Sequence, residues 1–386
     1  MGHATLLAVV YLAFISLGLP DSVLGVAWPA MRGDFARPLE AAGLVTIIIT
    51  ACSAASGFAS GQVLRLLGTG AVLTISGLLT GVALLGFSFA PSFGWILCLA
   101  VPLGLGAGSV DAAMNHFVAE HYSSRHMNWL HACWAVGATM GPLVMGQALA
   151  GVGGWQGGYR IIAMVQLALT LLFLLTIGWW GRARSVAPAS TGSFDKPLRK
   201  QAPVGWATWL APSLYLVYAT VEVGTGLWAA SILVDHRGLA ASSAGRWLAC
   251  FFGAIMLGRF ALGFVSVRLG NRRLVRAGLV VALVGALLFA APGLPHPLSL
   301  AGLVLLGLGC APVYPALMHE TTRRFDPATA LSVVGRQVAF SYIGGACGPA
   351  ALGLLGAAAG LDAILPTIVL AILLLLWMVW QLDRVT

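Results

Sequence analysis

Three acidic residues, Asp21, Asp111 and Glu222, stand inside stretches of the chain that are otherwise apolar. A charged carboxylate at the centre of a bilayer costs about 2.5 to 3.5 kcal/mol or more, so such acids face a bundle interior or a water-filled cavity. A carboxyl group that has lost its water also holds a proton more readily. We expect these three acids to serve proton coupling and solute binding; the alternative is a protonated or hydrogen-bonded structural acid.

The surroundings of Asp111 favour a binding site most strongly. Asn115 follows it by four residues in "GAGSVDAAMNHF", and Gly104 and Gly108 precede it at helical spacing, so all four share one helix face. Glycines let a neighbouring helix approach closely. The acid and the amide together are suited to binding a polyhydroxyl ligand or holding a proton.

A second polar face is expected in the stretch that opens "NWLHACWAVGATMGP". Asn128 and His131 are three residues apart on one face, and Trp134 lies beside them. Histidine titrates near neutral pH, which suits a proton relay or a hydrogen bond to a solute. A solvated histidine at the cytoplasmic mouth is the alternative.

Polar residues at helical spacing also occur in the second half of the chain. Glu222 and Thr225 are three residues apart, and Gln337 and Ser341 are four apart, so each pair shares a face. We expect these pairs to bind hydroxyl groups, and tryptophan rings to stack on a sugar. The candidate solute contacts are Asp21, Asp111, Asn115, Asn128, His131, Trp134, Glu222, Thr225, Trp228, Tyr314, Gln337 and Ser341, and Trp28 is a further candidate for the cavity.

The elements that carry these residues are predicted to be membrane-spanning helices. Charged residues make up 9% of the 386-residue chain and hydrophobic residues 59%, with a mean hydropathy of +0.92, whereas soluble domains hold roughly 25% charged residues. About 20 apolar residues cross the hydrocarbon core as a helix, and twelve such stretches are present. They span 4–31, 40–67, 69–90, 93–120, 126–152, 157–182, 206–235, 240–268, 271–293, 297–321, 328–357 and 360–383. We therefore predict an all-α integral membrane protein whose first stretch is a retained helix rather than a signal peptide.

The basic residues predict a topology. Of the 21 Lys and Arg residues, fourteen fall in the ends and loops on the N-terminal side of the membrane and five on the opposite side. By the positive-inside rule both termini are cytoplasmic, in the inner membrane. The remaining two, Arg259 and Arg336, lie within helices, where we expect gating or structural ion pairing. Scattered basic residues do not predict nucleic-acid binding.

Several function classes are disfavoured by missing motifs. The chain has no Walker pattern and no pair of nucleophile and base in a soluble context. Its six cysteines fall within predicted helices without metal-ligand spacing. We therefore expect no enzyme activity, no cofactor and no metal site. The expected partners are a small-molecule substrate, protons and the lipid bilayer, and the chain is expected to be a monomer.

The chain also repeats itself. "PLGLGAGSVDAAMNHF" (102–117) aligns without gaps on "LLGLGCAPVYPALMHE" (305–320), which places Tyr314 where Asp111 stands, and two shorter matches have nearly the same offset. A polar stretch rich in Pro, Ser and basic residues separates six predicted helices from six more. We predict an N-terminal six-helix bundle over 1–182, a cytoplasmic linker over 183–205 and a C-terminal six-helix bundle over 206–386. Chance similarity between Gly/Ala-rich helices is the alternative.

Two parallel six-helix repeats joined by a cytoplasmic loop form the fold of the major facilitator superfamily, and the chain resembles that superfamily along its whole length. The superfamily's motif in the loop after the second helix is only partly present. The stretch "GQVLRLLGTG" (61–70) keeps Gly61, Arg65 and Gly68 but lacks the acidic residue.

Within that superfamily, "LGLPDSVLG", "DAAMNHF" and "NWLH" with "GATMGP" are similar to the fucose permease branch of sugar/proton symporters. The resemblance implies that Asp21, Asp111 and Asn115 serve proton coupling and sugar binding. The chain departs from the branch's pattern by having Pro20 before the first acid, Asp rather than Glu as the second acid, and His116 after the amide.

These observations lead to three functional hypotheses. We expect proton-coupled uptake of a small polar solute, a monosaccharide, by alternating access. A proton-coupled drug or metabolite exporter is the alternative, and a non-transporting membrane sensor is less favoured. At 1.5 Å per residue, Asp21 lies past the middle of its helix towards the outside and Asp111 in the inner half of its own. We therefore expect the two acids to stand apart, as outer and inner members of a proton route.

Overall fold

The computed structural model describes residues 3–122, 124–183 and 205–386. Within these ranges fifteen α-helices account for almost all of the chain. Their bounds are α1 His3–Asp21, α2 Val23–Asp34, α3 Ala41–Leu67, α4 Thr69–Phe87, α5 Phe93–His121, α6 Ser124–Ala150, α7 Gly154–Leu175, α8 Ile177–Ala183, α9 Ala207–Ser231, α10 Ala241–Leu269, α11 Asn271–Ala290, α12 His296–Cys310, α13 Val313–Arg324, α14 Pro327–Ala359 and α15 Ile364–Val385. Two short helical turns, η1 Ile232–His236 and η2 Leu361–Ala363, extend α9 and precede α15.

In the described part of the chain, twelve helices or helix pairs are long and apolar enough to cross a membrane, which confirms the twelve predicted stretches. Two of these spans are broken. The first divides into α1 and α2 next to Asp21, one residue after Pro20, because proline offers no backbone N–H to the preceding turn. The tenth divides into α12 and α13 next to Pro312, whereas its sequence repeat α5 continues unbroken past Asp111. The two aligned segments are therefore similar in sequence, but one is a continuous helix and the other is broken.

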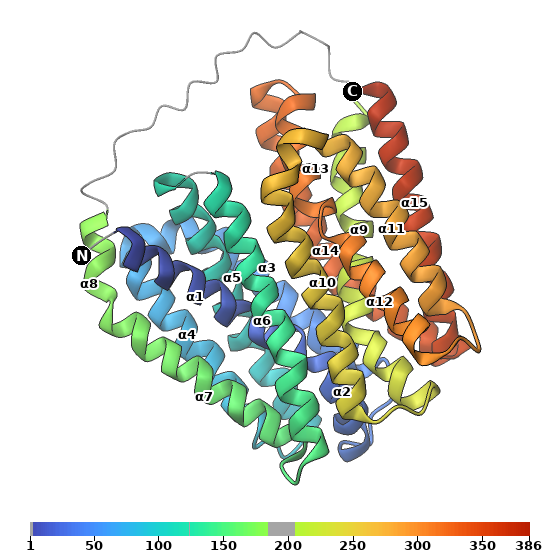
Figure 1. Cartoon of the computed structure of the whole chain (residues 1–386). Helices are drawn as coiled ribbons and strands as arrows, with labels where there is room; N and C mark the ends of the chain where they lie inside the picture. The colour runs from blue at the N-terminus through green and yellow to red at the C-terminus, as the bar shows by residue number, and fades with distance from the viewer. Residues whose placement is uncertain (1–2, 123, 184–204) are drawn as a thin grey trace.

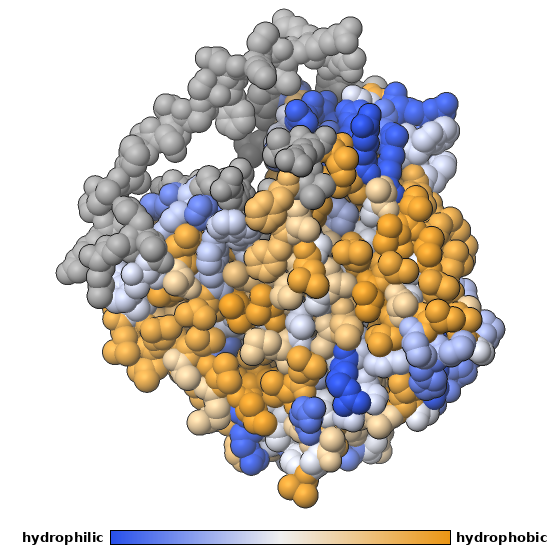
Figure 2. Space-filling model, viewed as in Figure 1, coloured by the Kyte–Doolittle hydropathy of each residue, from blue (hydrophilic) through white to orange (hydrophobic). Residues whose placement is uncertain are grey.

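The outer surface suits a lipid environment. Large apolar side chains such as Leu171 and Leu370 are 56% and 63% exposed. Figure 2 shows hydrophobic residues across the middle of the visible face, with hydrophilic residues gathered towards its upper and lower ends. Because water would penalise so much exposed apolar area, this arrangement is that of a multi-pass membrane protein.

The helices form two groups that lie side by side, α1 to α8 and α9 to α15 (Figure 1). The helix ends near the grey trace, where α8 ends and α9 begins, are here called the linker end, and the opposite side the far end. Of the predicted linker, residues 184–204 lie outside the described residues.

Among the described residues, the two groups touch mainly through α6 with α10, α3 with α14 and α2 with α9, and α2 also contacts α10. Glycines allow this approach at the far end. A Cβ added to Gly25 on α2 would lie 2.4 Å from the carbonyl oxygen of Gly226 on α9, and one added to Gly146 on α6 would lie 3.3 Å from Cα of Gly245 on α10. Side chains at these positions would hold the backbones apart, so small residues close the far end.

Candidate functional site

A cavity of about 1710 Å³ lies between the two groups of helices. Its wall includes residues at the linker end of the helices, among them Tyr122, Asn271 and Thr322, and it reaches inward to Tyr159 and Phe87. Because the glycine contacts close the far end, the cavity opens towards the linker end. A space of this size, with both groups in its wall, has room for a small solute and water.

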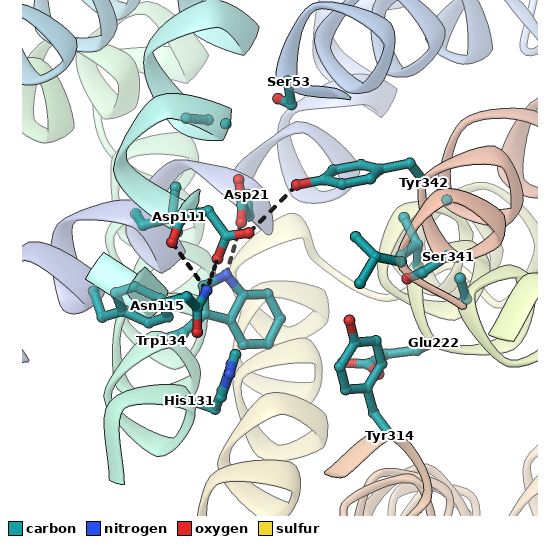
Figure 3. A pocket seen from close by; sticks show the side chains of 18 of the residues that line it. Asp21, Ser53, Asp111, Asn115, His131, Trp134, Glu222, Tyr314, Ser341 and Tyr342 are labelled. Carbon is teal, nitrogen blue, oxygen red and sulfur yellow. Dashed lines mark hydrogen bonds between the residues drawn. The ribbon is translucent and has the colours of Figure 1, made fainter. Parts of the chain in front are cut away.

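Asp111 on α5 lies in the wall of this cavity and accepts hydrogen bonds from both groups (Figure 3). Asn115 Nδ2 donates to Asp111 Oδ1 at 2.9 Å, one helical turn further along α5. Tyr342 on α14 donates its hydroxyl hydrogen to Asp111 Oδ2, with 3.3 Å between the oxygens. The structure thus brings the predicted Asp111 and Asn115 pair together and adds a partner from the opposite group.

Asp21 is the last residue of α1 and also lines the cavity. Its Oδ2 accepts a hydrogen bond of 2.7 Å from the indole Nε1 of Trp134 on α6. The next residue, Ser22, donates its hydroxyl to the carbonyl oxygen of Ala138 at 2.7 Å. These contacts attach the broken segment of the first span to α6 and fix the direction of the Asp21 side chain.

Asp21 and Asp111 lie in the wall of the same cavity, at different depths along their helices. Figure 3 shows both side chains in the same part of the cavity, each bonded to its own partners. The span that holds Asp21 runs over Thr5–Asp34, longer than expected, so Asp21 is within about 3 Å of the middle of its helix. Asp111 is about 6 Å from the middle of α5 along its axis. Asp21 thus lies nearer the middle of its helix than the predicted bounds implied, and Asp111 lies towards the linker end of α5; their outer and inner places in a proton route stay a prediction.

Glu222 on α9 also lines the cavity, but Arg259 on α10 balances its charge. Arg259 Nη2 lies 3.2 Å from Glu222 Oε1, and both side chains are 10% exposed. The guanidinium also lies 5.3 Å from the ring centroid of Trp134. The described side-chain hydrogen bonds to Asp21 and Asp111 come from uncharged donors, whereas Glu222 is bonded to an arginine. A proton role for Glu222 stays a prediction. The contact with Glu222 agrees with the prediction of ion pairing for Arg259.

Further predicted residues lie in the cavity wall: Asn115, His131, Trp134, Tyr314 and Ser341. The ring of His131 packs edge-on against Phe14 with 5.6 Å between centroids. The ring of Tyr314 packs edge-on against that of Tyr215 with 4.9 Å between centroids. Tyr314 and Asp111 occupy aligned positions in the sequence repeat, and both line the cavity.

Other predicted contacts lie away from the cavity. Trp28 and Trp228 are fully buried, and their indole N–H groups donate to the carbonyl oxygens of Leu39 and Pro349. Thr225 is 1% exposed and also lies outside the cavity wall. These three are packing residues in the structure, so we do not propose them as solute contacts. Asn128 lies on α6, but its side chain is outside the described part of the chain.

Gln337 also lies outside the cavity, because the predicted face of α14 was rotated by one residue. Gln337 Nε2 donates to Thr321 Oγ1 at 2.8 Å inside the second group of helices. A Cβ on Gly344 would lie 2.2 Å from the carbonyl oxygen of Leu216, so the glycine face of α14 packs on α9. The residues of α14 in the cavity wall are Val338, Ser341, Tyr342 and Gly345.

Sequence reasoning missed Tyr342 and Tyr218. The spacing of the cavity residues on α14, at i, i+3, i+4 and i+7, was the available signal for Tyr342, but the glycines drew the prediction to the adjacent face. Tyr218 on α9 donates to the carbonyl oxygen of Cys310 at 2.9 Å and lines the cavity. Among the described residues, no group of three or more His, Cys, Asp or Glu side chains is placed to hold a metal ion.

Comparison with known proteins identifies relatives of this fold. A family model described as Major Facilitator Superfamily matches residues 10–230 and 213–386. The chain is 26% identical to the "Uncharacterized transporter y4wD" of Sinorhizobium fredii over 341 residues, which cover 86% of each protein. It is 26% identical over 262 residues to the "Glucose/mannose transporter GlcP" of Bacillus subtilis, covering 63% of this chain and 61% of that relative.

A solved structure shares the whole fold. It is the structure of a bacterial homologue of the human lysosomal transporter Spinster, in an inward-facing and unoccupied conformation. The TM-score is 0.77 at 16% sequence identity, over 99% of this chain and 97% of the other. At this identity the match shows the shared arrangement of helices.

Proposed function

The chain belongs to the major facilitator superfamily of membrane transporters, and on that premise we propose that it takes up a small polar solute together with protons. The proposed solute class is the monosaccharides. The proposed mechanism is alternating access, in which the two groups of helices rock around the cavity. The proposed site consists of Asp21 and Asp111 as proton carriers, with Asn115, His131, Trp134, Glu222, Tyr314, Ser341 and Tyr342 as solute contacts.

One observation carries this proposal: two carboxyl groups lie in the wall of the central cavity and are held by the uncharged donors Trp134, Asn115 and Tyr342. A carboxylate without an ionic partner is costly inside a membrane protein, and a proton removes that cost. Proton binding at these acids would therefore favour a neutral cavity that changes conformation with its solute. Release of the proton at the higher pH of the cytoplasm would reset the transporter.

The lining supports a hydroxyl-rich solute. Asn115 and Ser341 offer amide and hydroxyl groups at the level of the two acids. Trp134 and Tyr314 also line the cavity, and aromatic rings can stack on the apolar face of a sugar. The printed name of GlcP, a glucose/mannose transporter, supports the same solute class.

We further propose that the linker end faces the cytoplasm of a bacterial inner membrane. Fourteen of the 21 Lys and Arg residues fall in chain ends and loops that the sequence assigns to this side of the membrane, in accord with the positive-inside rule. Both termini would then be cytoplasmic and the cavity would open inward. We propose that the monomer is the functional unit, because the cavity lies within one chain.

The proposal is tested in two steps. A thermal-shift screen of the purified protein against neutral sugars, organic acids and amines identifies the solute. Uptake of that solute into proteoliposomes is then measured with and without an inward proton gradient. We expect gradient-driven accumulation in the wild type and its loss in both D21N and D111N. Unchanged accumulation in both variants would reject proton coupling through these acids.

A second function is proton-coupled export of an apolar drug or metabolite. The apolar side chains in the wall of the cavity favour it. Phe14, Leu24, Phe252 and Leu262 give the cavity an extensive apolar lining. The direction of proton flux separates the two functions. Adding solute to the proton-poor side should draw protons along with the solute in a symporter and drive them the opposite way in an antiporter.

A further inference from the structure

Trp134 on α6 contacts partners from both groups of helices. Its indole Nε1 donates to Asp21 Oδ2 at 2.7 Å. Its ring lies below the guanidinium of Arg259 on α10, 5.3 Å from Cζ to the ring centroid, and its edge meets the ring of Phe252 at 6.2 Å between centroids. One side chain therefore joins a carboxyl group of the first group to a charged residue of the second.

Arg259 is held from its other side by Glu222. Its Nη2 lies 3.2 Å and 3.5 Å from the two carboxylate oxygens of that residue. A cation over an indole ring contributes about 0.5 to 2 kcal/mol, more where water is excluded. The position of the indole thus affects the ion pair, and Arg259 affects the position of the indole.

The contact between Trp134 and Arg259 lies where the packing of α6 against α10 ends, on the side of the linker end. The two helices run antiparallel, and Gly146 with Gly245 and Thr139 with Gly253 meet nearer the far end. Beyond Trp134, towards the linker end, the helices diverge around the cavity. A change at Trp134 therefore acts where the closed part of the structure meets the open part.

We propose that Trp134 is the positioning residue that couples the charge of Asp21 to the Arg259–Glu222 ion pair of the opposite helix group. The inference rests on the proposed proton coupling, and it names the side chain that would connect the proton site to the opposite helix group. An ionised Asp21 accepts a charge-assisted hydrogen bond, which fixes the indole and keeps its face under Arg259. A proton on Asp21 removes that assistance, so the indole and the arginine above it gain freedom.

Other charged and titratable groups also face Asp21. Asp111 from α5 and Tyr342 from α14 interact with it electrostatically. His131 lies on α6 in the same cavity wall, as do Glu222 and Tyr218 of α9 and Arg259 of α10. Charge effects can thus reach Asp21 through space, and the experiment has to separate them from an effect that passes through the indole.

A double-mutant cycle makes that separation. The protein is placed in lipid nanodiscs, and the infrared band of protonated carboxyl groups is followed between about pH 4 and about pH 9, a range that includes shifted carboxyl groups. The part of the band that D21N removes reports Asp21. The cycle compares the wild type, W134F, E222Q and W134F/E222Q. Phenylalanine keeps a ring near Arg259 but removes the N–H donor to Asp21.

The expected result is non-additivity. E222Q should shift the titration midpoint of Asp21 in the wild type, and most of that shift should be absent when W134F is present. W209F is the matched control, because Trp209 lies under Arg336 at 4.5 Å and outside the cavity wall. It should leave both the midpoint and the effect of E222Q unchanged.

A second substitution tests the same connection from the other side. R259K keeps a positive charge beside Glu222 and removes the planar group that stacks on the indole. It should shift the Asp21 midpoint in the wild type and not in W134F, and it replaces E222Q if that variant does not fold. Additive shifts in these cycles would overturn the role of Trp134 and leave the proton role of Asp21 standing. Absence of any titrating band that D21N removes would overturn both.

Discussion

The hydroxyl group of Tyr342 lies 3.3 Å from Asp111 Oδ2, so a hydrogen bond connects α14 to α5 across the central cavity. Among the described contacts, Asp111 accepts a hydrogen bond directly from the opposite helix group, and Asp21 does not. Asp21 reaches that group through Trp134 and Arg259. Both proposed proton sites are thus connected to both groups of helices.

Y342F tests the connection at Asp111. The substitution keeps the ring and removes the donor, and a hydrogen bond to a charged group contributes about 1.5 to 3 kcal/mol. We expect proton-driven uptake to fall about tenfold or more, because about 1.4 kcal/mol corresponds to a factor of ten. Initial rates in proteoliposomes with an inward proton gradient provide the measurement.

Y11F is the matched control for that change. The Tyr11 hydroxyl is buried and has no hydrogen-bond partner among the described residues, and Tyr11 lies outside the cavity wall. Removing this oxygen should leave uptake at the wild-type level. Equal uptake by Y342F and Y11F would show that the hydrogen bond to Asp111 does not matter for transport.

The closed far end predicts different effects for two glycines of the same helix. A Cβ on Gly25 would lie 2.4 Å from the carbonyl oxygen of Gly226, whereas a Cβ on Gly33 would have no atom within 4 Å. We expect G25A to lose about 1 to 3 kcal/mol of stability through overpacking. G33A should be neutral or gain up to about 1 kcal/mol, since alanine favours a helix. Thermal unfolding in detergent measures both, and equal unfolding temperatures would contradict the close contact.

An ion pair also joins the two groups at the far end. Arg32 on α2 lies 2.9 Å from Asp235 in η1, with both side chains partly exposed. D235N should change stability by no more than about 1 kcal/mol, the usual range for exposed pairs. It should nevertheless speed hydrogen exchange at the adjoining ends of α2 and η1, because it removes a contact between the groups.

D362N serves as the comparison for that substitution. Asp362 pairs with His236 at 2.8 Å, and both residues belong to the second group of helices. D362N also removes one negative charge at the far end, and it should leave hydrogen exchange in α2 unchanged. Faster exchange of α2 in D362N as well would indicate a general charge effect rather than a contact between the groups.

Gln337 and Ser341 separate packing from solute binding on one helix. Gln337 is buried and bonded to Thr321, so Q337A should lower stability by about 1 to 3 kcal/mol with little change in the KM of the solute. Ser341 lines the cavity, so S341A should raise KM several-fold with little change in stability. Unfolding temperatures and uptake kinetics for the two variants are the readouts. A reversed pattern would place the solute on the other face of α14.

The fold was predictable from the sequence because its signal is long and redundant. Each span needs some 20 apolar residues, and a few misassigned positions do not change the number of spans. Asp21 and Asp111 could be selected from the sequence as candidate site residues, because an acid stands out in an apolar segment. Asn115 followed from helical spacing alone, and the structure places it 2.9 Å from Asp111.

The tertiary structure decided which neighbouring face of each helix meets the cavity. Gln337 and Tyr342 lie on opposite sides of Ser341 along α14, and packing contacts such as that of Gly344 against Leu216 fix the rotation of that helix. Thr225 and Trp228 were misplaced for the same reason, because one residue turns a helix by about 100°. The pairing of Glu222 with Arg259, 37 positions apart, depends on how α9 packs beside α10.

The sequence by itself therefore determined the number of spans and the acids that stand inside them. These properties depend on the transfer of each segment into lipid, which is local to the segment. Only the tertiary structure decided that Asp21 and Asp111 share one cavity and that Trp134 and Tyr342 connect them to the other helix group. Those relationships depend on the tilt, rotation and crossing of helices far apart in the chain, which small side chains at the contacts set.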